Sequence, residues 1–198
     1  MTKILACDPG MKGGFAWNDK DGNVCIQKMP VVYDRVVERV KNGKTSINPK
    51  TGKTIYHTDK SYKKVRNDIE TSKSIRDFMK KFANSGYEFW SEKVGKPINH
   101  DRIRVMNMNA VATFAHHIGV LEQTAHCFYM ELKQIHSKKW QEELGDFTHG
   151  LDNFARTKRK SEINRKVKEL YPNLKGITLD TADALGIFHI VNKIYNEE

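Results

Sequence analysis

The spacing of apolar positions at the start of the chain is that of short strands. An apolar run from Lys3 to Cys7 is followed by two further strand-like segments, Gly13–Trp17 and Val24–Met29. Asp21-Gly22 between the second and third segments is a hairpin turn signal. We therefore expect three consecutive strands, the first of which ends directly before Asp8.

The apolar spacing becomes helical at Val65 and stays so until about Phe82, where Asn84-Ser85-Gly86 is a plausible end. We expect a strand over Tyr87–Val94, which carries Glu92, and a last strand over Cys127–Leu132. Further helices are predicted over Val105–Leu121, Ser137–Leu144, Lys158–Tyr171 and Asp180–Tyr195.

The segment Val105–Leu121 has two apolar stripes. One consists of Val105, Met108, Ala112, Ala115 and Gly119, and the other of Val111, Phe114, Ile118 and Leu121. One stripe can cover the sheet. For the other, two hypotheses stay open: it meets a second copy of the chain in a symmetric dimer, or it is buried within a single core.

The order of these elements predicts an α/β fold in which helices flank a mixed five-stranded sheet. The 198 residues suit a single domain, 1–198. From about residue 30 to residue 64 the pattern dissolves into a polar, basic stretch with the turn dipeptides Asn42-Gly43 and Thr51-Gly52. We expect this stretch to be an insertion or a mobile loop.

The composition indicates a polyanionic partner. The chain has 34 Lys and Arg against 24 Asp and Glu, a net charge of +10, which favours nucleic acid. No apolar run approaches the roughly 18 residues of a membrane span, and Asp8 interrupts the apolar run near the N-terminus, unlike in a signal peptide. Together with three widely spaced cysteines, these features predict a cytoplasmic protein with reduced thiols and no membrane partner.

Basic residues concentrate in two stretches, 35–81 with 14 Lys and Arg against five acids and 133–168 with ten against five. The best candidates for phosphate contacts are Lys138, Lys139, Lys158, Arg159 and Lys160. The alternative for these residues is a solvated surface. The string Asn48–Thr54 ends like a phosphate-binding loop, but Ile47 stands where that loop needs glycine, so we expect no nucleotide cofactor.

Four acids fall at the ends of predicted elements: Asp8, Glu92, Asp180 and Asp183. The last two are three residues apart and share one helical face. Mg²⁺ prefers oxygen ligands, and two such ions about 3.5 to 4 Å apart can hold both the attacking and leaving oxygens of a phosphodiester. Taken singly, each acid also fits a turn, a solvent-facing strand position or a helix start. The joint pattern favours a metal site.

These motifs resemble the RuvC family of Holliday junction resolvases in the RNase H-like superfamily. Ile4–Gly10 followed by Gly13–Ala16 is similar to the family's first strand, acid and glycine turn, and Phe89–Val94 resembles the strand that supplies its glutamate. Asp180–Ile187 resembles its final acidic helix. The long basic stretch 30–64 departs from bacterial members and indicates a viral or phage-type branch.

The resemblance implies an RNase H-like fold and a homodimer. It also implies that Asp8, Glu92, Asp180 and Asp183 bind two Mg²⁺ ions, for which Mn²⁺ can substitute, and hydrolyse a phosphodiester to a 5′-phosphate and a 3′-hydroxyl. The expected function is a structure-selective endodeoxyribonuclease that resolves four-way DNA junctions in recombination and repair. Two alternatives stay open: another RNase H-like nuclease acting on branched DNA or an RNA–DNA hybrid, and a non-catalytic DNA-binding module.

Overall fold

A computed structural model of the chain describes residues 2–93, 108–150 and 152–197. The described residues divide into two compact units. One contains those of Met1–Pro30 and Ser72–Glu198, and the other contains Val31–Thr71.

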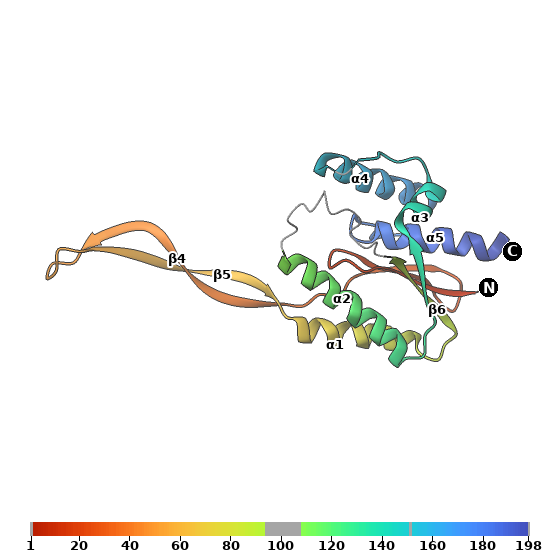
Figure 1. Cartoon of the computed structure of the whole chain (residues 1–198), viewed down its shortest axis with the longest axis horizontal. Helices are drawn as coiled ribbons and strands as arrows, with labels where there is room; N and C mark the ends of the chain where they lie inside the picture. The colour runs from red at the N-terminus through yellow and green to blue at the C-terminus, as the bar shows by residue number, and fades with distance from the viewer. Residues whose placement is uncertain (1, 94–107, 151, 198) are drawn as a thin grey trace. The chain divides into compact units, whose positions relative to one another are not determined.

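The larger unit is built on one sheet, and the predicted mixed sheet of five strands between helices is confirmed. β2 lies antiparallel to both β1 and β3, whereas β6 is parallel to β1 and β7 is parallel to β6. The strand order is β3-β2-β1-β6-β7. The strands, drawn in Figure 1, are β1 (Lys3–Asp8), β2 (Gly14–Asn18), β3 (Val24–Lys28), β6 (Tyr87–Lys93) and β7 (Leu132–His136).

One face of the sheet is covered by the C-terminal helices. α5 (Ala182–Glu197) packs directly on β1 and β2, and both α3 (Ser137–Leu144) and α4 (Asn153–Leu170) pack on α5. Ile4 and Ala6 of β1 point into this layer and share one buried core with α5. Every residue from Thr181 to Phe188 is buried, so the start of α5 is anchored firmly against the sheet.

The opposite face carries an aromatic layer. Because neighbouring strand residues alternate between faces, Phe15 and Trp17 point away from α5. The ring centroid of Phe15 lies 4.5 Å from that of Phe78, and the centroid of Trp17 lies 5.5 Å from that of Phe82. These partners come from α1 (Asp68–Met79) and the short 3-10 helix Lys80–Phe82. Figure 1 shows α1 and α2 (Met108–Cys127) on the side of the sheet opposite α3, α4 and α5.

The second unit is a long two-stranded hairpin, in the stretch for which the sequence predicts an insertion or a mobile loop. β4 (Tyr33–Ile47) pairs antiparallel with β5 (Thr54–Arg66). Asn42-Gly43 is not the turn: it lies in β4 where the pairing register shifts, and Gly43 has a φ of 76° there. The turn is made by Asn48, whose side-chain Oδ1 accepts hydrogen bonds from the backbone N–H groups of Lys50 at 2.9 Å and Thr51 at 3.3 Å. The turn dipeptides of this stretch indicate a loop from local sequence alone. The two strands form because they pair with each other, and that pairing involves residues distant in sequence.

Two element boundaries differ from the prediction. α1 begins at Asp68 and not at Val65, because Val65 and Arg66 pair with β4 and Asn67 Oδ1 accepts from the Glu70 N–H at 3.0 Å. α4 begins at Asn153, five residues early, because Asp152 caps it by accepting from the Ala155 N–H at 2.8 Å.

The strand predicted over Cys127–Leu132 is wrong. α2 continues to Cys127, and Tyr129, with a φ of 53°, turns the chain so that the Met130 N–H bonds to the Ala125 carbonyl at 3.0 Å. β7 follows at Leu132–His136. An apolar run as short as this fits a helix end as well as a strand, and its periodicity does not distinguish them.

The two stripes of α2 have different surroundings. Ala112, Ala115 and Gly119 are exposed, whereas Leu121 on the other stripe is buried. Val105, with which the predicted helix begins, lies outside the described residues, as does Val94 at the end of the predicted strand. Among the described helices, none is long and apolar enough to cross a bilayer.

Two helical glycines give a matched test of the packing of α5. An added Cβ at Gly186 would lie 2.9 Å from Trp140 Cζ3 and 3.1 Å from Leu144 Cδ2, whereas one at Gly119 would meet nothing within 4 Å. We expect Gly186→Ala to lower the free energy of unfolding by about 1 to 3 kcal/mol through overpacking. Gly119→Ala should raise it by about 0.5 to 1 kcal/mol, since alanine favours the helix. Urea unfolding of both variants measures this, and equal shifts of the same sign would contradict it.

Candidate active site

Asp8 stands at the carboxyl end of β1, where the chain turns sharply. Gly13 makes the turn possible: its N–H bonds to the Gly10 carbonyl at 2.8 Å, and an added Cβ would lie 2.2 Å from the Asp8 carbonyl oxygen. The Gly10 N–H donates to Asp8 Oδ1 at 3.2 Å. The buried His117 of α2 donates from Nδ1 to the Pro9 carbonyl at 2.8 Å. The turn is thus held from inside and from the neighbouring helix.

Glu92 comes to Asp8 through the register of two parallel strands. Cys7 of β1 pairs with Ser91 of β6, so the next residue of each strand, Asp8 and Glu92, lies at the same edge of the sheet. Both carboxylates are partly buried. The carboxyl ends of parallel strands meet at one edge, which is where α/β folds commonly place their functional groups.

The two acids of the last motif have different places. Asp183, in the first turn of α5, is only 9% exposed and lines the same pocket as Asp8 and Glu92. Asp180 lies before the helix and does not line the pocket; its Oδ2 is 2.9 Å from Lys28 Nζ of β3. The structure therefore brings three of the four predicted acids together and leaves the fourth in an ion pair nearby.

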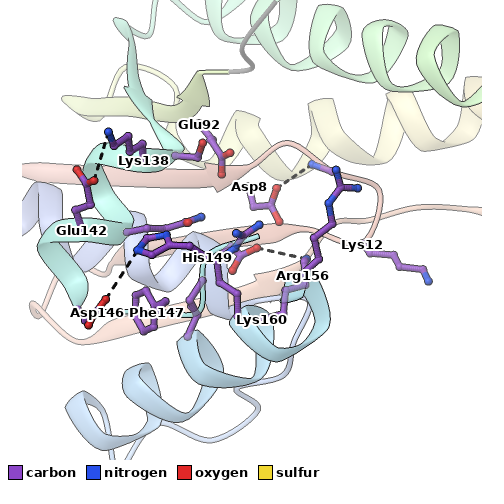
Figure 2. A pocket seen from close by; sticks show the side chains of 17 residues that line it. Asp8, Lys12, Glu92, Lys138, Glu142, Asp146, Phe147, His149, Arg156 and Lys160 are labelled. Atoms are coloured by element: carbon purple, nitrogen blue, oxygen red, sulfur yellow. Dashed lines mark hydrogen bonds and ion pairs between the residues drawn. The ribbon is translucent and has the colours of Figure 1, made fainter. Parts of the chain in front are cut away.

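A pocket of about 670 Å³ surrounds these three carboxylates. Five acids and five Lys or Arg side chains line it, and they differ in depth. Asp8, Glu92 and Asp183 are buried or partly buried, whereas four of the five basic residues are exposed and Arg159 is half-buried. Figure 2 shows Asp8, Glu92, Arg156 and Lys160 around the same hollow. The charged residues that line it are Asp8, Glu92, Glu142, Asp146, Asp183, Lys12, Lys138, Arg156, Arg159 and Lys160.

Burial raises the pKa of all three acids, and repulsion between carboxylates adds to the rise for Asp8 and Glu92. Burial, followed by the charge of Asp183, raises the pKa of Asp8 to about 6. Burial, followed by the charges of Asp8 and Asp183, raises the pKa of Glu92 to about 7, against the opposing effect of the Trp140 indole. Burial also raises the pKa of Asp183. The negative charge of this cluster is therefore costly while no cation neutralises it.

Lys160 of α4 partly neutralises the cluster. Its Nζ lies 3.4 Å from Asp183 Oδ2. Burial lowers the pKa of Lys160, but the charges of Asp183 and Asp8 outweigh burial and raise it, so the ammonium form is retained. Asp183 Oδ1 is buried and has no hydrogen-bond partner in the described part of the chain.

The donor chemistry of this cluster fits a hard divalent cation, which takes carboxylate oxygens as ligands. Asp183 Oδ1 has no hydrogen-bond partner in the described part of the chain, and the pKa values of Asp8 and Glu92 are raised. Both features are expected of buried carboxylates that no cation neutralises. Within residues 2–93, 108–150 and 152–197, however, no three Asp, Glu, His or Cys side chains are close enough to hold an ion as they stand. An ion would therefore need these carboxylates to move closer together.

The five predicted phosphate contacts do not all reach the pocket. Lys138, Arg159 and Lys160 line it, whereas Lys139 and Lys158 do not. Lys158 instead lies 4.0 Å from Glu162, one turn along α4. Sequence reasoning missed Arg156, which also lines the pocket. The predicted helix began at Lys158 and so excluded Arg156. With the start at Asn153, residues 156, 159 and 160 share one face of the helix and residue 158 does not.

The fold and the pocket define the chain as an α/β protein with a mixed five-stranded sheet and with carboxylates at the carboxyl ends of β1 and β6. No protein-family model and no curated protein matches the sequence. Among solved structures, the chain is similar to Thermus thermophilus RuvC, with a TM-score of 0.46, 12% identity, and coverage of 93% of this chain and 90% of that chain. It is also similar to T. thermophilus RuvC in complex with a Holliday junction substrate, with a TM-score of 0.47, 11% identity, and coverage of 94% and 90%.

The raised carboxylate pKa values predict how stability depends on pH in the absence of divalent ions. Between the unfolded pKa of about 4 and the folded values of about 6 and 7, the native state keeps protons that the unfolded chain releases. Stability should therefore fall as pH rises through this window. Glu92→Gln should remove part of that fall, because glutamine has no proton to release. The variant should be about 1 to 3 kcal/mol more stable than wild type at pH 8, a range that allows for screening of the carboxylate charge by solvent.

Urea unfolding in EDTA at several pH values measures this difference. Asp21→Asn, which removes an exposed carboxylate in the turn between β2 and β3, is the control and should follow wild type. A Glu92→Gln variant with the same pH slope as wild type would contradict the assignment.

Proposed function

We propose that the protein is a Mg²⁺-dependent endonuclease that resolves four-way DNA junctions. The observation that carries the proposal is the convergence of Asp8, Glu92 and Asp183, desolvated by burial, in a pocket that five Lys or Arg side chains also line, against two further acids, Glu142 and Asp146. Buried acids alone would repel a phosphodiester. Buried acids with exposed basic neighbours suit a cation at depth and a polyanion above it.

The buried acids and the exposed basic residues of the pocket would have different roles. Asp8, Glu92 and Asp183 would hold Mg²⁺, which when bound activates water and neutralises charge on the scissile phosphate. Asp180 would join them as the fourth acid once its 2.9 Å ion pair with Lys28 opens. The turn at Gly13 fixes the position of Asp8, so at least one carboxylate is placed before any ligand arrives.

The basic side chains of the pocket would position the substrate. Arg156, Arg159 and Lys160 project from one face of α4, and Lys138 projects from α3. Lys160 lies within reach of Asp183, so a phosphate drawn to this ammonium would also approach the carboxylate cluster. Phosphate contacts of this kind fix the register of a nucleic acid and carry no sequence information by themselves.

The choice of a junction as substrate rests on the motif resemblance and on α2. The exposed stripe of Ala112, Ala115 and Gly119 would let two copies approach closely and form a homodimer. A twofold dimer presents two pockets related by symmetry, which matches the two equivalent strands that must be cut to resolve a junction.

We expect the protein with Mg²⁺ to nick a synthetic four-way junction symmetrically across the branch point, leaving 5′-phosphate ends. Asp8→Asn should bind the junction with wild-type affinity but lower cleavage by at least about a hundredfold, because a deep ligand is lost while the basic walls remain. Gel analysis of end-labelled junctions measures both properties, with Asp21→Asn as the control that should cut normally.

The same assay separates the alternatives when linear duplex, Y-shaped DNA and an RNA–DNA hybrid are included. Cleavage of the hybrid alone would assign the chain to ribonuclease chemistry. Binding to DNA without any cleavage, with Mg²⁺ or Mn²⁺, would refute the enzyme and leave a DNA-binding module.

A second prediction concerns two arginines of α4. Arg156 lines the pocket, whereas Arg165 is paired with Glu169 at 2.8 Å and does not line it. We expect Arg156→Gln to weaken junction binding by about 3- to 10-fold and to reduce the dependence of log K on log salt by about 0.9. Arg165→Gln should leave both unchanged. Anisotropy titrations at several salt concentrations measure this, and equal losses in the two variants would show that only net charge matters.

A further inference from the structure

The β4–β5 hairpin has two faces of different character. Residues paired across an antiparallel ribbon point to the same side, and neighbours along a strand point to opposite sides. The register pairs Tyr33 with Arg66 and Arg35 with Lys64, which places these four on one side. Tyr62, two residues from Lys64, is on that side as well.

We call this side the Arg35 face and define it as Tyr33, Arg35, Tyr62, Lys64 and Arg66. Its two rings are open to solvent, with Tyr33 52% and Tyr62 56% exposed. The guanidinium carbon of Arg35 lies 3.8 Å from the centroid of the Tyr62 ring. The described residues of this face include three basic side chains and two tyrosines but no acid. Arg66, at the base, is ion-paired with Asp68 of α1, so the positive charge of the face rests mainly on Arg35 and Lys64.

The other side of the ribbon differs in charge. Near the base of the hairpin it presents Asp34, Val36, Lys63 and Val65, one acid and one base among two valines. Asp34 accepts a hydrogen bond from Asn67 Nδ2 at 2.9 Å. The positive charge is therefore concentrated on one side by the strand period, and not spread evenly around the hairpin.

We propose that the Arg35 face is a binding surface for duplex nucleic acid, distinct from the carboxylate pocket. Arg35 and Lys64 lie directly opposite each other, and like charges in that position destabilise a ribbon. A bound polyanion would offset this repulsion, because both cations would then face phosphate groups. Arg35 is held flat on Tyr62, which leaves its edge donors free to meet phosphate oxygens.

The dimensions of the ribbon suit this partner. A two-stranded ribbon fits the major groove of a duplex. From Tyr33 to Lys41 the strand would span about 27 Å, which is roughly eight base pairs at about 3.4 Å each. The exposed tyrosines add ring surfaces that can pack on sugars or bases.

This inference shares the nucleic-acid partner of the proposed function but does not depend on cleavage. Its test therefore measures binding alone, with the full-length protein in EDTA. The probe is a fluorescently labelled DNA duplex of about two helical turns, titrated at several salt concentrations, with a four-way junction in parallel.

Two adjacent lysines of β5 provide a matched pair, because Lys64 is on the Arg35 face and Lys63 is on the other side. We expect Lys64→Gln and Arg35→Gln each to weaken duplex binding by about 3- to 10-fold and to reduce the salt slope by about 0.9. Lys63→Gln, which removes the same charge from the same strand, should stay within about twofold of wild type, and Lys64→Arg should bind as wild type does. Circular dichroism of each variant checks that the hairpin is retained.

Equal losses in Lys63→Gln and Lys64→Gln would overturn the proposal, since net charge would then explain binding. Unchanged binding in both Lys64→Gln and Arg35→Gln would also overturn it, and a change of sedimentation in those variants would assign the face to a second copy of the chain. Face-specific loss of binding in a protein that never cuts DNA would support the ribbon while refuting the nuclease.

Discussion

The structure depends on one electrostatic constraint, the gathering of acids that repel one another at the edge of the sheet. Parallel pairing of β1 with β6 sets Asp8 beside Glu92, and the packing of α5 on β1 adds Asp183. Burial raises the pKa of all three, and the repulsion of neighbouring carboxylates adds to the rise for Asp8 and Glu92.

Several neighbouring features answer this constraint. Lys160 brings a cation from α4 to Asp183, and Lys28 does the same for Asp180 from β3. The glycine turn after β1 offers the Gly10 N–H to Asp8, and His117 fastens that turn to α2. Cations thus come from two elements, α4 and β3, while hydrogen bonds from the glycine turn and from α2 hold the turn that carries Asp8. The core on either side of the sheet, aromatic on one face and centred on α5 on the other, fixes the strands that carry the acids.

Sequence reasoning predicted the parts of the molecule in which local pattern and tertiary packing agree. The three opening strands, the sheet class, the helix at Ser137–Leu144 and the placing of Asp8, Glu92 and Asp183 at element ends all follow from short-range signals. It failed where distant contacts decide. The hairpin depends on cross-strand pairing between residues up to 33 apart in the chain, such as Tyr33 with Arg66, and the turn dipeptides inside it suggested a loop.

Within the site, residue type alone could not separate Arg156 from Lys158, since only the direction of each side chain from α4 decides which one meets the pocket. The ion pair that holds Asp180 was equally hidden, because Lys28 is 152 residues away.

The base of the hairpin has a consequence for how related proteins can differ. The Asn67 N–H bonds to the Val32 carbonyl at 2.9 Å, so the chain enters and leaves the ribbon at neighbouring points. Pairs of residues can therefore be added or removed at the far turn, in steps that keep the two-residue strand period, without disturbing that closure. The length of the hairpin, and with it the length of partner that it can contact, can then change in evolution or by design without any change to the carboxylate pocket.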